Sequence, residues 1–172
     1  MTIDPDTKDW TWVLTAECPE CGFDARTVEL NDLADLIRIN ATAWRTVLGL
    51  DDASVRPADN VWSPLEYACH VRDVHRVFRG RVEQMLTEDD AKFENWDQDR
   101  AAIDDDYGSQ DPATVADELV AAAEAVAATY SGVSGDQWER RGTRSNGSEF
   151  TVDTIGRYHL HDAVHHLFDV RG

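Results

Sequence analysis

The chain has few cysteines and no long apolar run, and both features limit the class of protein to which it can belong. Its three cysteines, Cys18, Cys21 and Cys69, are too few for a disulfide framework, and their odd number favours a reducing compartment. No stretch approaches the roughly 18 consecutive apolar residues of a membrane span, and no basic segment followed by an apolar run opens the sequence. We therefore expect a cytoplasmic protein with no membrane partner and no secretory signal.

Positive charge is also scarce. The 16 Lys and Arg residues face 34 Asp and Glu residues, which gives a formal net charge of −18, and the acidic residues are spread over every segment. Nucleic-acid binding requires a basic surface, so we expect no nucleic acid and a small molecule as the substrate. The length of 172 residues suits one domain with a core of its own.

Apolar residues recur at helical spacing in four segments, and no segment of comparable length alternates with a period of two. The second segment has the clearest start, because Ser63, Pro64 and Glu66 fit the N-cap, N1 and N3 positions of a capping box. The third starts in a similar way, with Asp111 as cap and Pro112 at N1. We predict an all-α fold, an antiparallel four-helix bundle with helices over residues 31–49, 64–86, 112–131 and 151–170.

The connection over residues 88–110 is unusually long for a small bundle. It is strongly acidic and carries isolated aromatic residues. Connections of this length often cover a site, but a solvated crossover pinned by Trp96 fits the sequence equally well. Residues 132–150 are rich in Gly, Ser and Asn and read as a loop.

Four histidines lie close together in the last predicted helix, and their spacing separates them. His161 and His165 are spaced i, i+4, about 6 Å apart along the axis on one face, as two ligands of one metal would be. His159 and His166 are spaced i, i+7, about 10 Å apart, which is too far to share an ion. We therefore take His161 and His165 as candidate ligands and the other two as flanking residues.

A third ligand must come from another helix, since catalytic sites usually have three protein ligands. His70 and His75 in the second helix are spaced i, i+5, so we expect at most one of them to face the bundle centre. His70 lies beside an apolar stripe and His75 lies among arginines, which favours His70. Asp73 and Asp162 could orient ligand histidines, although a solvated surface position is the commoner role of aspartate.

The first residues carry a second candidate site, the pair Cys18 and Cys21 in the segment CPECG. Two thiols on a tight turn resemble half of a zinc ribbon. Three interpretations remain open: a metal site completed elsewhere in the chain or by a second subunit of a homodimer, a redox-active dithiol, or a turn whose cysteines only pack. We place this N-terminal extension at residues 1–28 and the bundle domain at residues 29–172.

Two segments resemble the DinB/YfiT-like superfamily of four-helix metalloproteins. They are VWSPLEYACHVRDVHRVF, residues 61–78, and HDAVHHLFDV, residues 161–170. In that family a histidine of the second helix and a His-x-x-x-His pair of the last helix bind a divalent metal, usually zinc or nickel. The resemblance, which spans residues 30–170, implies that His70, His161 and His165 hold such a metal.

The resemblance also implies a function. Members with known activity are thiol-dependent enzymes: transferases that couple bacillithiol, mycothiol or glutathione to an electrophile, and a mycothiol-dependent maleylpyruvate isomerase. We therefore expect a metal-dependent enzyme that uses or transfers a low-molecular-weight thiol as co-substrate. The alternatives are a metal-dependent hydrolase, in which the open coordination position holds water, and a noncatalytic metal-binding stress or binding protein.

Overall fold

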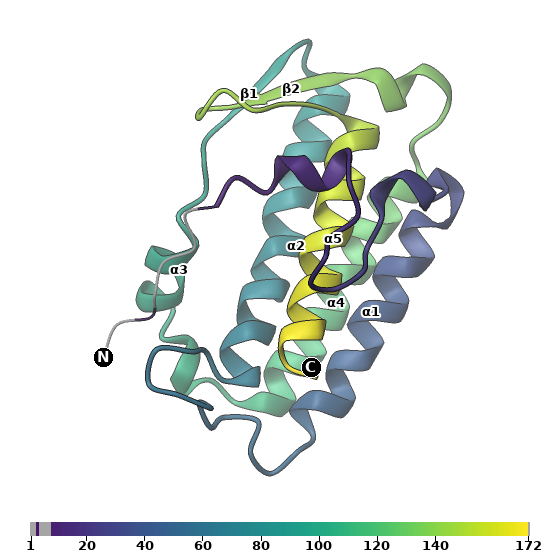
Figure 1. Ribbon diagram of the computed structural model, residues 1–172. Helices are drawn as coiled ribbons and strands as arrows, with labels where there is room; N and C mark the ends of the chain where they lie inside the picture. Colours follow the sequence, from purple (N-terminus) through teal and green to yellow (C-terminus); the bar gives the residue numbers. More distant parts are fainter. Residues whose placement is uncertain (1–2, 4–7, 172) are drawn as a thin grey trace.

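Four long helices form the body of the protein in a computed structural model that describes residue 3 and residues 8–171 (Figure 1). The predicted four-helix bundle with an N-terminal cysteine-bearing extension is confirmed, and the helix ends lie within two residues of those expected. Ser63 forms the predicted capping box with Glu66, and the Asp111 side chain accepts from the Thr114 backbone. The long helices are α1 (Leu33–Leu48), α2 (Pro64–Thr87), α4 (Pro112–Ser131) and α5 (Val152–Asp169).

The order of the helices in space differs from their order in the chain. Helices α1 and α2 each pack mainly against α4 and α5, so α1 and α2 lie diagonally across the bundle. Helices α2 and α4 run in the same direction, because the connection between them returns along the length of the bundle (Figure 1). That connection contains a short helix, α3 (Gln98–Asp104).

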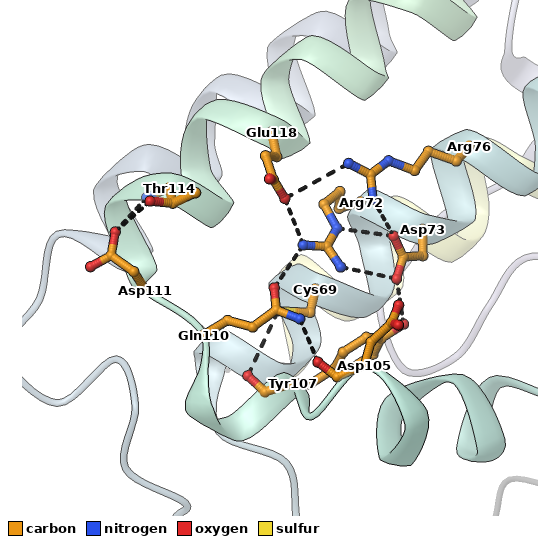
Figure 2. Close-up of polar contacts among 10 residues, drawn as sticks. All are labelled: Cys69, Arg72, Asp73, Arg76, Asp105, Tyr107, Gln110, Asp111, Thr114 and Glu118. Atoms are coloured by element: carbon orange, nitrogen blue, oxygen red, sulfur yellow. Dashed lines mark hydrogen bonds and ion pairs between the residues drawn. The ribbon is translucent and has the colours of Figure 1, made fainter.

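A buried polar network attaches this connection to the bundle. Arg72 on α2 donates to Asp73 at 2.9 Å, to Gln110 at 2.8 Å and to Glu118 of α4 at 2.7 Å (Figure 2). The Tyr107 hydroxyl donates to the other oxygen of Asp73 at 2.6 Å. Burial alone would raise the pKa of Asp73, but the hydrogen bonds from Arg72 and Tyr107 outweigh it and hold that pKa below its ordinary value.

A small three-stranded sheet lies across the end of the bundle where α2 ends and α5 begins (Figure 1). Its middle strand, β2 (Arg141–Arg144), pairs in parallel with β1 (Ala91–Phe93) and antiparallel with β3 (Glu149–Thr151). The loop predicted over residues 132–150 therefore contains most of the sheet. Gly142 is required in β2, because a Cβ there would lie 2.6 Å from the Phe93 ring.

The N-terminal arm, residues 8–32, crosses the outer side of α5 (Figure 1). It contains three short 3₁₀ turns, Thr11–Leu14, Ala25–Thr27 and Leu30–Asp32. Arg157 of α5 donates to the carbonyl oxygens of Ala25 and Val28 at 2.5 and 2.6 Å, which fixes the end of the arm. No helix in the described part of the chain combines the length and apolarity needed to cross a bilayer.

Candidate metal centres

Helix α5 presents two pairs of metal-binding side chains at the i, i+4 spacing, offset from each other by one residue. His161 and His165 form one pair, and Asp162 and His166 form the other. Successive helix residues point about 100° apart, so the two pairs face different directions. Each pair meets side chains from another part of the chain, and α5 thus contributes to two candidate metal centres.

The three histidines predicted as one ligand set do not meet in one group. His70 belongs to one group, whereas His161 and His165 belong to another, and within each group the ligand atoms lie within 4.8 Å of one another. The two groups are the His70 centre, made of His70, Asp162 and His166, and the cysteine–histidine centre, made of Cys18, Cys21, His161 and His165.

In the His70 centre the carboxylate of Asp162 lies between two imidazoles. Its Oδ1 is 3.6 Å from Nε2 of His70 and 3.6 Å from Nε2 of His166. Two such atoms on one tetrahedral metal lie about 3.3 Å apart, given metal–ligand bonds of about 2.0 Å. Nε2 of His70 and Oδ1 of Asp162 are buried, and neither has a hydrogen-bond partner in the described structure. The donor set therefore fits a divalent metal.

A further carboxylate lies beside the third candidate ligand, His166. Nδ1 of His166 lies 3.0 Å from Oδ2 of Asp169, so this ring can donate to Asp169 while Nε2 faces the centre. Metal-binding histidines commonly donate their second nitrogen to a carboxylate, which fixes the tautomer and the ring orientation.

The electrostatics of the centre favour the ligand forms of its side chains. Burial lowers the pKa of His70, which favours its neutral imidazole. Burial alone would raise the pKa of Asp162, but the contact with His70 and the nearby His166 outweigh it and hold that pKa far below its ordinary value. Neutral imidazole and ionised carboxylate are the forms that bind metals.

The His70 centre borders a cavity of about 660 Å³. Asp162 and His166 lie in its wall, and Trp96 stacks on the His70 ring with centroids 5.4 Å apart. Trp96 comes from the long acidic connection, so this segment both packs on the bundle and lines the cavity. The volume falls within the range of pockets that bind small molecules.

The cysteine–histidine centre joins the arm to α5. Sγ of Cys18 lies 3.7 Å from Nδ1 of His165. Cys18, His161 and His165 are buried and Cys21 is half-buried. Both cysteines are free thiols, and burial raises the pKa of Cys21 to about 11.

Sequence reasoning missed Asp162 and His166 as members of a centre. The sequence predicts Asp162 only as a carboxylate that could orient a ligand histidine or lie at the surface, and it predicts His166 as a flanking residue. The two residues have the same i, i+4 spacing as His161 and His165, and aspartate is itself a metal ligand. That spacing was the available signal.

Both α2 histidines are buried, although at most one was expected to face the centre. His75 lies opposite α5, where its Nδ1 is 2.8 Å from Nε2 of His159. The Tyr130 hydroxyl lies 3.2 Å from Nδ1 of His159. Helix α2 is covered on a wide arc by α4 and α5, so two directions along it are interior.

These features define a helical-bundle protein with candidate metal centres on its last helix, and sequence comparison supplies the family. The profile of the DinB superfamily matches residues 36–168, and the chain belongs to this superfamily. Comparison with curated protein sequences gives no match.

A solved structure shares the fold. YfiT from Bacillus subtilis, described as a probable metal-dependent hydrolase with an unusual four-helix bundle topology, matches with a TM-score of 0.69. The sequence identity is 15%, and the match covers 91% of this chain and 89% of that chain. The likeness shows a common fold over most of the chain.

Proposed function

We propose that this chain is a metal-dependent hydrolase whose divalent metal is held by His70, Asp162 and His166. The observation that carries the proposal is that Nε2 of His70 and Oδ1 of Asp162 are buried without a hydrogen-bond partner and face each other at 3.6 Å in a centre that borders a large cavity. The carboxylate of Asp169 orients His166 at 3.0 Å. The proposed set keeps His70 from the predicted set of His70, His161 and His165 and pairs it with the carboxylate and histidine that lie nearest to it in the same group.

The donor set favours water as the nucleophile. Two imidazoles with one carboxylate occur in catalytic zinc sites of hydrolases, where three protein ligands leave a position open. A divalent metal there would lower the pKa of a bound water and polarise a substrate carbonyl. Zinc suits this set best, and nickel and iron(II) also accept it. YfiT, with the same fold, is itself described as a probable metal-dependent hydrolase.

The charge of the cavity restricts the substrate. Among the residues that the structure describes, six carboxylates line it against two cationic side chains, so a strongly anionic substrate would be repelled. Aromatic rings from Trp62, Tyr67 and Trp96 provide apolar faces. We therefore propose an uncharged or cationic ester or amide as the substrate. The charged lining residues are Asp9, Glu20, Asp97, Asp99, Asp162, Asp169, Lys8 and Arg144.

The second candidate function is the transfer of a low-molecular-weight thiol, which would bind as a co-substrate. No cysteine occurs among the described residues that line the cavity, so thiol chemistry would require a thiol co-substrate. The acidic lining favours an uncharged thiol such as mycothiol over glutathione or bacillithiol, which carry carboxylates. A metal in the His70 centre would favour the thiolate form of that sulfur.

Metal analysis and turnover test the proposal together. We expect Asp162→Asn to lose the metal of the His70 centre and to abolish hydrolysis of uncharged esters and amides by the zinc-loaded protein. Asp35→Asn, the same change on an exposed carboxylate of α1, is the matched control and should keep both. Thiol-dependent turnover with mycothiol and a generic electrophile, without hydrolysis, would establish the second candidate instead. Unchanged metal content in Asp162→Asn would refute the site.

A further inference from the structure

The N-terminal arm contains a turn that holds two thiols in a fixed orientation. The Gly22 backbone donates to the Cys18 carbonyl at 2.8 Å, and the Cys18 backbone donates to the Phe23 carbonyl at 2.8 Å. Gly22 has φ +74°, a conformation that glycine adopts without strain. The turn aims Cys18 and Cys21 at the same side, toward α5.

Two histidines of α5 complete the group. The ligand atoms of Cys18, Cys21, His161 and His165 all lie within 4.8 Å of one another. The Cys18 Sγ to His165 Nδ1 distance of 3.7 Å is close to the about 3.6 Å expected for two ligands of a tetrahedral zinc ion, with Zn–S about 2.3 Å and Zn–N about 2.0 Å. Nε2 of His161 is buried and has no hydrogen-bond partner in the described structure.

The second nitrogen of His165 also has carboxylates near it. Its Nε2 lies 3.5 Å from Oε2 of Glu20 and 3.7 Å from Oδ1 of Asp169. An imidazole that faces a metal with one nitrogen and a carboxylate with the other is the usual arrangement in zinc sites.

We propose that Cys18, Cys21, His161 and His165 bind a second metal ion, zinc, in a closed structural site. Four protein ligands leave no open position, which distinguishes this site from the three-ligand His70 centre. Two thiolates and two neutral imidazoles also balance the charge of a zinc ion. The ligands come from one chain, so no second subunit is needed to complete the site.

The site would fasten the arm to the bundle beside the cavity. Trp10 of the arm packs on the rings of His161 and His165, with centroids 5.5 and 4.9 Å away, and it lines the cavity together with Glu20. Binding of zinc between the arm and α5 would hold this part of the cavity wall in place. Loss of zinc should therefore loosen the arm without removing the His70 centre.

Cadmium spectroscopy on the full-length protein tests the site independently of any activity. We expect the cadmium-loaded wild type to show a thiolate-to-cadmium charge-transfer absorption, because two cysteines would bind the ion. The absorption should be lost in Cys18→Ser and should persist in Asp162→Asn, which removes a ligand of the other centre. Cys69→Ala is the matched control, since Cys69 is a buried cysteine outside both groups.

Zinc content and limited proteolysis supply the second readout. Cys18→Ser should lose about one equivalent of zinc and become sensitive to cleavage in the arm, whereas Cys21→His should retain zinc because histidine can replace the thiolate. A wild type with no charge-transfer absorption would overturn the proposal. A Cys18–Cys21 disulfide in zinc-free protein purified under native conditions would also overturn it, in favour of a redox pair.

Discussion

Replacing His75 by Asn should make the protein less sensitive to acid. His75 is fully buried on α2, and burial lowers its pKa to about 4 from an ordinary value of 6.5. Between these two values the unfolded chain binds a proton that the folded chain refuses, so the free energy of unfolding falls as the pH drops through this window. The loss is negligible at pH 7 and grows to about 2 kcal/mol at pH 5 for this one residue.

Asparagine is a suitable replacement because its short amide can keep a hydrogen bond at the position of Nδ1, which lies 2.8 Å from His159. Asparagine does not titrate. Between pH 7 and pH 5 the free energy of unfolding of His75→Asn should therefore fall by about 2 kcal/mol less than that of the wild type. Urea unfolding at both pH values, with a chelator present so that metal ligands contribute equally, measures the difference. Equal losses in the two proteins, with equal urea m-values, would refute the reasoning.

Three other substitutions test packing and the polar network. Gly156→Ala should destabilise the protein by about 1–3 kcal/mol, because the new Cβ would lie 2.6 Å from Leu33. The matched change Gly80→Ala in α2, where nothing lies within 4 Å of the new Cβ, should stabilise the protein by about 0.5–1 kcal/mol. Thermal unfolding measures both variants, and changes in stability of the same sign would contradict this reasoning. Tyr107→Phe removes the hydrogen bond to Asp73 and should lower the free energy of unfolding, measured in urea, by about 1–3 kcal/mol. An unchanged free energy of unfolding would show that the network does not need the Tyr107 hydroxyl.

The helices were predictable because their signals are local. Ser63 with Pro64, and Asp111 with Pro112, mark helix starts within a few residues of sequence, and the periodicity marks the lengths. The parallel pairing of β1 with β2 was not predictable, because it joins strands about 50 residues apart, and each strand is too short to show a period.

The sequence predicts a metal site on the last helix, but it does not show which side chains of this helix meet those of the other elements. Helical spacing identifies His161 and His165 as a pair, but it marks Asp162 and His166 equally well. The choice depends on how α5 is rotated in the bundle, and this rotation is set by packing against α2 on one side and the arm on the other. Cys18 and Cys21 lie at least 140 residues before His161 and His165, so no local pattern relates these cysteines to these histidines.

The one-residue offset between the two pairs on α5 ties the length of this helix to the chemistry of both centres. Inserting a single residue before His161 would turn the rest of the helix by about 100°, which would carry His161 toward the direction that Asp162 now faces. His161 and His165 would then face the direction of His70, while Asp162 and His166 would face the direction that Ala163 and Leu167 now take, so neither pair would meet its other ligands. Insertions and deletions in α5 should therefore be far less tolerated than substitutions, and homologues that keep both centres should keep the number of residues between β3 and His161 unchanged.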